Sequence, residues 1–175
     1  LLIIAELVLV FVLSARINKM SVTTATVMLI VYSVLNGATL SFIFLAYSLG
    51  SIAKTFFITT GMFGVMALVG ATTKRDLSKM GSILMMALIG LIIASLVNIF
   101  LRSSGFDWII SIIGVVLFTA LTAYDVQRVK RLATASDLYD DTQVGRLAII
   151  SALSLYLDFI NLFLYLLRFF GRNDG

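Results

Sequence analysis

The chain has 175 residues, 61% of them hydrophobic, and its mean hydropathy is +1.09. Soluble domains contain roughly 45–50% apolar residues, so this composition predicts a membrane protein with several spans. The sequence holds neither cysteine nor histidine, which excludes disulfides, thiol catalysis, thiolate metal sites and a histidine pH switch. The formal net charge of +4 arises from bases spread over loops between apolar segments, which favours membrane topology signals over nucleic-acid binding.

Six apolar segments nearly exhaust the chain, because one crossing of a bilayer takes about 20 residues. The segments are Leu1 to Ala15, Val22 to Ser48, Ser51 to Ala71, Gly81 to Leu101, Trp108 to Gln127 and Leu147 to Phe170. Each should be a helix, since a segment in hydrocarbon must satisfy its backbone polar groups internally. The sequence therefore predicts a single all-α transmembrane domain over residues 1–175.

Basic residues gather in alternate loops and predict the orientation of the helices. The three basic loops contain Arg16 and Lys19, then Lys74, Arg75 and Lys79, then Arg128, Lys130 and Arg131. Cytoplasmic loops carry an excess of Lys and Arg, so these loops are expected in the cytoplasm. Leu1 would then start outside, and one further helix before it would restore a cytoplasmic N-terminus, which gives seven helices in the intact protein.

The longest polar stretch, residues 132–146, joins the last two apolar segments and contains Asp137, Asp140 and Asp141. A calcium loop of the EF-hand kind would need the spacing D-x-[DN]-x-[DN]-G-x5-E, which this stretch lacks. We therefore expect a solvated linker here.

Two carboxylates, Asp125 and Asp158, lie inside the last two apolar segments. An ionisable group at membrane depth costs several kcal/mol unless it is paired, protonated or wetted, and such groups mark ion paths, proton relays or switches. Asp125 can instead reach the headgroups or pair with Arg128 at i+3. For Asp158 the alternative is an internal hydrogen-bonded group without a role in transport.

Polar residues on the last segment recur with helical spacing. Ser154, Asp158, Asn161 and Tyr165 fall at i, i+4, i+7 and i+11. This spacing places them on one face of a helix. Because lipid would not accept a polar stripe, we expect this helix to turn the stripe inward and to be the most buried helix, in the middle of the bundle.

Glu6 is a third intramembrane carboxylate, in the first apolar segment. Its place near the end of that segment fits an interfacial residue as well as a functional one. On the second segment Tyr32, Asn36 and Thr39 share one face, and this pattern favours contact between helices.

Four motifs stand out along the chain: NGATLS at 36–41, TTKRDLS at 72–78, LTAYDVQ at 121–127 and LSLYLDFINLFLYLLRFFG at 153–171. With these motifs the whole chain resembles the Bax inhibitor family of transmembrane proteins, and its bacterial branch most of all. The resemblance begins where that family's second helix would begin. It implies a bundle of seven helices in which the last helix is surrounded by the other six.

The resemblance also implies a function, a pH-sensitive calcium leak across the membrane. Asp125 and Asp158 match the family's paired aspartates, which share a proton or hydrogen bond in the closed state and serve as pH sensor, gate and transient calcium ligands. Arg16 is the nearest match to a basic residue that latches the first aspartate. Candidate pore-lining residues are Glu6, Ser154, Asn161 and Tyr165. Calcium is the transported ion, and no cofactor is expected.

Elementary electrostatics supports such a role for a carboxylate pair. Two carboxylates within a few ångströms cannot both ionise cheaply, so they titrate as a unit. When both are ionised, they repel each other and offer hard oxygen ligands suited to calcium. One pair of side chains can therefore serve as proton sensor and as ion site.

Three other functions use intramembrane acids. An intramembrane aspartyl protease is disfavoured, because its second aspartate follows G-x-G whereas Asp158 follows L-Y-L, and a proline-free chain cannot carry its Pro-Ala-Leu element. The alternatives are a proton-coupled cation exchanger and a regulatory protein that binds another membrane complex. We expect no enzyme activity, no nucleic-acid partner and a location in the bacterial inner membrane.

Cysteine labelling in this cysteine-free chain tests the topology. We expect cysteines at positions 19, 79 and 130 to react only from the cytoplasm, and one at position 54 only from outside, because the basic loops alternate. Gly175 is expected outside as well. A membrane-impermeant reagent that labelled Lys19→Cys, Lys79→Cys and Lys130→Cys in intact cells would refute this orientation.

Overall fold

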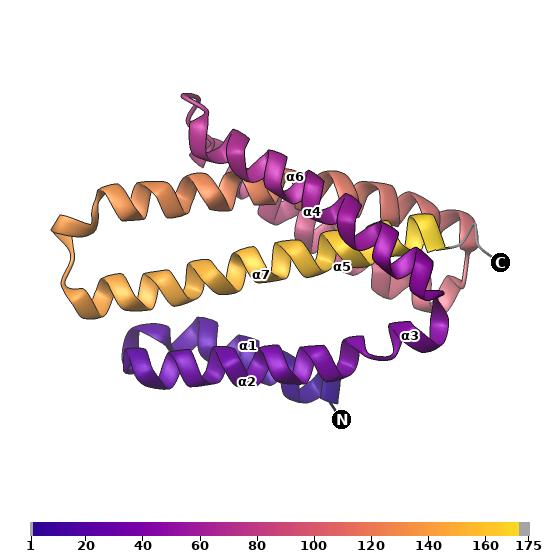
Figure 1. The fold of residues 1–175 in the computed structure, drawn as a ribbon, viewed down its shortest axis with the longest axis horizontal. Coiled ribbons are helices and arrows are strands. Elements are labelled where there is room, and N and C mark those ends of the chain that lie inside the picture. The colour runs from indigo at the N-terminus through magenta and orange to yellow at the C-terminus, as the bar shows by residue number, and fades with distance from the viewer. Residues whose placement is uncertain (1, 172–175) are drawn as a thin grey trace. The chain divides into compact units, whose positions relative to one another are not determined.

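The structure, a computed structural model, describes residues 2–171, and these form helices joined by short turns (Figure 1). The α-helices are α1 (Leu2–Arg16), α2 (Val22–Leu40), α3 (Ile43–Ala46), α4 (Leu49–Thr72), α5 (Gly81–Leu101), α6 (Ser104–Thr134) and α7 (Asp141–Gly171). Single turns of 3-10 helix occupy Ile17–Lys19, Ser78–Met80 and Ser136–Leu138. Between residues 2 and 171 there is no β-strand. The predicted all-α class is confirmed.

Five stretches are long and apolar enough to cross a membrane. They are Val22–Ala46, Leu49–Thr72, Ser78–Leu101, Ser104–Thr134 and Asp141–Gly171, and they correspond to five of the six predicted segments. The first predicted segment forms α1. Its 15 described residues are fewer than the roughly 20 residues that one crossing of a membrane needs. Leu1 and Gly175, which the topology prediction also concerns, lie outside the described residues.

The second predicted segment is interrupted. The sequence predicts one helix over residues 22–48, but α2 stops at Leu40 and α3 adds a single turn after it. At the interruption the Ser41 hydroxyl donates to the Ala38 carbonyl at 2.6 Å. The backbone N–H groups of Phe42 and Phe44 donate to carbonyls only three residues back, those of Thr39 and Ser41, at 3.3 and 3.2 Å, so the α-helical pattern gives way here to a tighter 3-10 turn.

The stretch at 132–146, expected to be a linker, is mostly helical. α6 continues to Thr134, and α7 already begins at Asp141. The Asp140 carboxylate accepts the backbone N–H of Gln143 at 2.7 Å and so caps the first turn of α7. Residues 137–143 are exposed, as a solvated stretch should be. Hydropathy shows where a chain leaves hydrocarbon, and a helix can continue beyond that point.

The described chain divides into two compact units, residues 2–47 with Val129–Ser154 and Ser48–Arg128 with residues 155–171. In the first unit α1 packs along α2, while the end of α6 and the start of α7 run antiparallel (Figure 1). Arg146 Nε donates to the Met20 carbonyl at 2.7 Å, and Val22 lies against Gly145. These contacts join the start of α7 to the start of α2.

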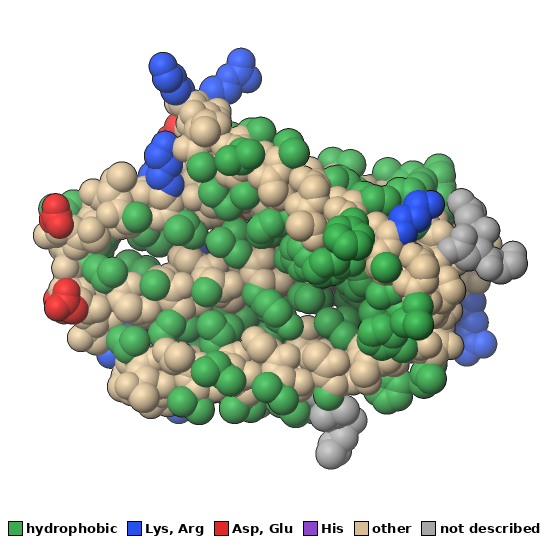
Figure 2. Space-filling view, in the orientation of Figure 1, with side chains coloured by type: hydrophobic (Ala, Val, Ile, Leu, Met, Phe, Trp, Pro, Cys, Tyr) green, Lys and Arg blue, Asp and Glu red, His purple; other side chains and the backbone are tan. Residues whose placement is uncertain are grey.

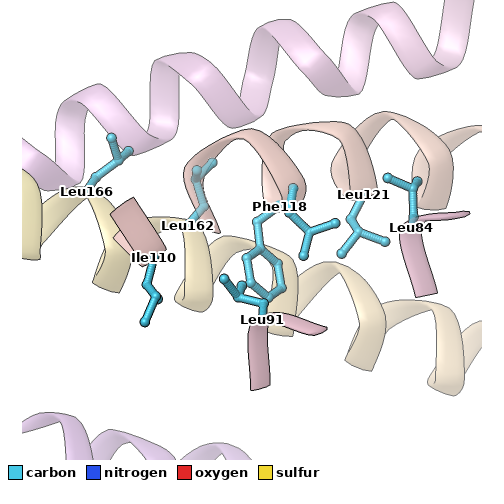
Figure 3. Close-up of a cluster of buried hydrophobic side chains, with 8 residues drawn as sticks. Leu84, Leu91, Ile110, Phe118, Leu121, Leu162 and Leu166 are labelled. Carbon is cyan, nitrogen blue, oxygen red and sulfur yellow. The ribbon is translucent and has the colours of Figure 1, made fainter. Parts of the chain in front are cut away.

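The second unit is built around one apolar cluster. Its buried members are Leu84 and Leu91 of α5, Ile110, Leu117, Phe118 and Leu121 of α6, and Leu162 and Leu166 of α7. Figure 3 draws these side chains from the three helices and labels all of them except Leu117. α4 joins them through Phe56 and Phe63, whose rings meet Phe159 of α7 with centroids 5.9 and 5.4 Å apart. Within this unit α7 therefore lies among α4, α5 and α6.

Large apolar side chains cover the outer surfaces of the helices (Figure 2). Phe11 and Phe57 are each 74% exposed, and Phe100 is 86% exposed. In water such side chains would lose roughly 1.5–3 kcal/mol each relative to burial, whereas acyl chains accept them. Lys and Arg side chains gather instead where α4 ends (Figure 2). The surface is that of a protein surrounded by lipid.

As expected, α7 turns its polar stripe away from the surface, and between residues 155 and 171 Arg168 is its single exposed residue, although α6 has the larger share of fully buried residues. In the most apolar part of α6, 44% of residues are buried, against 33% in α7. α6 supplies half of the apolar cluster, and it also has small residues at positions where neighbouring groups approach closely. A small side chain lets a neighbouring helix cover the helix backbone itself. α6 is therefore buried where it faces α4 as well as where it faces α7.

Two glycines allow close contacts between α6 and its neighbouring helices. At Gly70 of α4, an added Cβ would collide with the backbone carbonyl of Ala123. At Gly114 of α6, an added Cβ would lie 2.7 Å from ring atoms of Tyr165. Close approach at such small residues gains van der Waals contact, which drives helix association where lipid replaces water.

A substitution at Gly70 tests the close approach of α4 to α6. We expect Gly70→Ala to lower the free energy of unfolding by about 1–3 kcal/mol, because the new methyl group overfills the contact. Gly64, on the same helix, has no neighbouring atom within 4 Å of an added Cβ, so Gly64→Ala should cause no loss. Denaturation in detergent micelles, followed by circular dichroism, measures both. Equal stabilities would contradict this packing.

Candidate functional site

Asp125 and Asp158 both belong to the second unit, and the structure brings them together. Their carboxyl groups lie within hydrogen-bonding reach of each other. Only 8% of Asp125 and 4% of Asp158 is exposed. Both side chains are therefore shielded from lipid, as an ionisable group inside a span must be.

The antiparallel contact between α6 and α7 explains why these residues meet. Near the start of α6, Asp107 lies 3.7 Å from Arg168 near the end of α7. Further along α6, Phe118 stacks on Tyr165 with ring centroids 5.9 Å apart. Contacts nearer the C-terminus of α6 thus involve residues nearer the N-terminus of α7. The same register, continued toward the C-terminal end of α6, brings the two aspartates to one level.

The two carboxyl groups have different surroundings. Arg128 follows Asp125 by about one turn on α6, and its positive charge acts on Asp125, as the i+3 spacing predicts. Oxygen Oδ2 of Asp158 is buried and has no hydrogen-bond partner among the described residues. A buried oxygen without a donor costs about 1–3 kcal/mol. A proton, a water molecule or a cation at this oxygen would remove that cost.

The aspartate pair alone supplies few ligands for a metal ion. Calcium takes about 6–8 oxygen ligands. Within residues 2–171 no group of three or more His, Cys, Asp or Glu side chains could hold a metal ion. A calcium ion at the pair would keep water molecules or use hydroxyl and carbonyl oxygens as well, and this set suits a passing ion better than a permanent one.

The other residues of the polar stripe on α7 lie in different environments. Ser154 and Asn161 are half-buried, and the Asn161 amide donates to the Leu157 carbonyl at 2.8 Å within its own helix. The ring of Tyr165 packs against α6, and its centroid lies 5.5 Å from Cζ of Arg168. Pore lining by Ser154, Asn161 and Tyr165 stays a prediction.

Glu6 forms a second buried carboxylate site, in the first unit. It is 8% exposed. Its Oε2 accepts a hydrogen bond from the Asn36 amide at 3.2 Å, and its Oε1 accepts one from the Thr39 hydroxyl. Hydrogen bonds to a charged acceptor are about twice as strong as neutral ones. The face of α2 that the sequence assigns to helix contact therefore makes a polar contact with α1.

Arg16 is the last residue of α1 and is exposed. It belongs to the first unit, whereas the aspartate pair belongs to the second. The proposed latch from Arg16 to Asp125 would be a contact between the units, and it stays a prediction.

Sequence reasoning missed the contacts of Gln127. Its side chain is buried, with Oε1 accepting the Leu77 backbone N–H at 2.9 Å and Nε2 donating to the Arg75 carbonyl at 2.8 Å. One signal could have found it. Gln127 ends the LTAYDVQ motif, where a polar side chain closes an apolar span two positions after an aspartate.

The sequence also did not predict a row of buried hydroxyl groups on α4. Ser51, Thr55 and Thr59 are buried, and their spacing of four residues places them on one face. Thr59 donates to the carbonyl of Thr55 at 2.8 Å, whereas the Thr55 hydroxyl has no partner among the described residues. The signal was weak because threonine is also common as a packing residue in membrane helices.

These features define a class, a helical membrane protein with several spans and a buried carboxyl pair between two antiparallel helices. The family described as "Inhibitor of apoptosis-promoting Bax1" matches residues 1–175. The chain therefore belongs to the Bax inhibitor family, which confirms the resemblance of its motifs.

Similar proteins occur in several bacteria. Inner membrane protein YbhL of Escherichia coli K12 is 54% identical over 171 residues, which cover 98% of this chain and 73% of that protein. An uncharacterized protein of Borreliella burgdorferi is 56% identical over 169 residues, covering 95% and 72%. An uncharacterized membrane protein of Streptococcus pyogenes serotype M1 is 45% identical over 172 residues, covering 98% and 73%.

The Glu6 site predicts a clear difference between two threonines of α2. We expect Thr39→Val to lower the free energy of unfolding by about 1–3 kcal/mol, because it removes a donor from a buried carboxylate. The control is Thr26→Val, since Thr26 is exposed and its hydroxyl bonds only to the Val22 carbonyl of its own helix; its effect should stay within about 0.5 kcal/mol. Detergent denaturation measures both, and equal losses would count against the site.

Proposed function

We propose that this protein is a pH-sensitive calcium leak channel of the bacterial inner membrane, gated by Asp125 and Asp158. The observation that carries the proposal is the pairing of these two buried carboxyl groups. Membership of the Bax inhibitor family supports it. The location is supported by a relative that is itself named an inner membrane protein.

A shared proton would hold the pair closed. With one proton between them, the carboxyl groups can hydrogen-bond and so connect α6 to α7. When that proton leaves, two negative charges face each other in surroundings of low dielectric constant and repel. The repulsion then favours separation of the helices or capture of a cation between the carboxylates.

Calcium fits the ionised pair chemically. It prefers hard oxygen ligands, and two carboxylates would neutralise its charge. The small number of acidic ligands within residues 2–171 means that an ion would retain water and would be held weakly. Conduction requires this balance, because an ion must bind well enough to enter and weakly enough to leave.

Other residues have supporting roles in the proposal. Candidate pore-lining residues are Glu6, Ser154, Asn161 and Tyr165. Glu6 is the acidic member of this set, and its two oxygens accept hydrogen bonds from Asn36 and Thr39 of α2. Arg16 is the candidate latch, since a guanidinium can pair with a carboxylate through two parallel hydrogen bonds.

A proton-coupled cation exchanger is the second candidate function. The same observation favours it, because a buried carboxyl pair can bind protons and cations in turn. The two functions differ in coupling. A leak channel passes calcium without a proton gradient, whereas an exchanger moves protons in the opposite direction whenever a calcium gradient is imposed.

Calcium entry into proteoliposomes, measured with an enclosed dye between about pH 5 and pH 8, tests the gate. We expect wild-type flux to depend on pH. Asp125→Asn and Asp158→Asn should each change its amplitude and remove most of the pH dependence, because either change abolishes the shared titration. Asp137→Asn is the matched control, since Asp137 is exposed in the turn before α7.

Two results would count against the proposal. An unaltered pH profile in both single variants would mean that the pair is not the pH sensor. Proton movement driven by a calcium gradient, with little flux when protons cannot move, would favour the exchanger over the channel.

A further inference from the structure

Gln127 makes two hydrogen bonds to the loop between α4 and α5. It accepts from the Leu77 backbone N–H at 2.9 Å and donates to the Arg75 carbonyl at 2.8 Å. Because Gln127 is only 7% exposed, competition from water for these bonds is small. An amide bound through both its oxygen and its nitrogen has one allowed orientation, so these bonds fix the loop relative to α6.

The loop and the aspartate pair lie on different faces of α6. Successive helical residues are about 100° apart, so Gln127 and Asp125 point in nearly opposite directions. Asp125 points to Asp158 of α7. Ala123 shares a face with Gln127, four positions away, and it is there that Gly70 of α4 rests on α6. The turn that carries Asp125 is therefore held from both sides.

The start of α5 adds a third contact to this turn. An added Cβ at Gly81, the first residue of α5, would lie 2.5 Å from the hydroxyl oxygen of Tyr124. The end of α4, the loop and the start of α5 thus all meet the short segment 123–127 of α6. If the end of α4, the loop and the start of α5 shift together, segment 123–127 of α6 must shift with them, because closely packed side chains transmit displacement.

We infer that Gln127 is a positioning residue for the aspartate pair. It ties the α4–α5 loop to α6 and so sets how closely Asp125 approaches Asp158. This inference rests on the proposed gate and adds a means of controlling it, since a displacement of the loop reaches the pair through Gln127. The loss of Gln127 would alter the pair without removing any atom of it.

Few charged groups act on Asp125 within its unit. Asp158 acts from α7 and Arg128 from α6. α5 contains no charged residue, and the charged residue of α4, Lys54, lies near the opposite end of that helix. The loop contributes the exposed residues Lys74, Arg75, Asp76 and Lys79. Because Gln127 is neutral, its replacement leaves all of these charges in place.

Infrared spectroscopy of the full chain in lipid nanodiscs tests the inference. The carboxylic acid stretching band is followed against pH, and the band of the pair is identified by its loss in the double variant Asp125→Asn/Asp158→Asn. Gln127→Met removes both hydrogen bonds at similar volume. Leu77→Pro removes the N–H donor from the loop side and leaves α6 unchanged; the backbone φ of −82° at Leu77 suits proline. Gln143→Met, at an exposed position, is the matched control.

We expect Gln127→Met and Leu77→Pro each to shift the midpoint of the band by about 0.5–2 pH units, in the same direction. Gln143→Met should leave the midpoint unchanged. An unchanged midpoint in the folded variants would overturn the inference, even if their unfolding temperatures fell, and either variant decides if the other does not fold. The band requires no ion flux, so a protein without calcium flux would refute the proposed function and still give a result here.

Discussion

Tyr165 of α7 rests on α6 where Gly114 has no side chain, and this contact sets the register between the two helices. Both helices rise by about 1.5 Å per residue, so a register set at one level is kept along their shared length. Asp125 lies about three turns from Gly114, at the level where Asp158 arrives from the opposite direction. The position of the carboxyl pair thus follows from the packing of α6 against α7, in which the ring of Tyr165 contacts Gly114.

The same register places a polar pair beside an apolar cluster. Leu121 and Leu162 belong to that cluster, and each lies about one turn along its helix from an aspartate. Well-packed apolar side chains at the two aspartates would stabilise the unit more than an incompletely bonded pair, because burial of such groups is seldom repaid. Natural proteins keep such local costs mainly at functional sites. The oxygen of Asp158 that lacks a partner among the described residues is a cost of this kind, and it supports a functional role for the pair.

The sequence predicted the features that hydrophobicity and charge control. Long apolar runs identified five of the spans, and two carboxylates in adjacent antiparallel segments indicated the pair. It did not reveal that Asp140 caps α7, because a polar stretch outside the membrane can be helix or loop. It also did not reveal the contacts of Gln127, since its partners are the backbone groups of Arg75 and Leu77. Every residue carries such groups, so only the folded loop shows which of them a side chain will reach.

The two buried carboxylate sites differ in how completely they are bonded, and this difference bears on what each can do. Both oxygens of Glu6 receive a donor, from Asn36 and Thr39. At the aspartate pair, Asp158 Oδ2 lacks a donor among the described residues, and the group that bonds to the Asp158 carboxyl is another acid, Asp125. A fully bonded carboxylate gains little from a new ligand, whereas an oxygen without a donor gains from a proton, a water molecule or a cation. Exchange of ligands is therefore favoured at the pair, while the Glu6 site is better suited to holding α1 and α2 together.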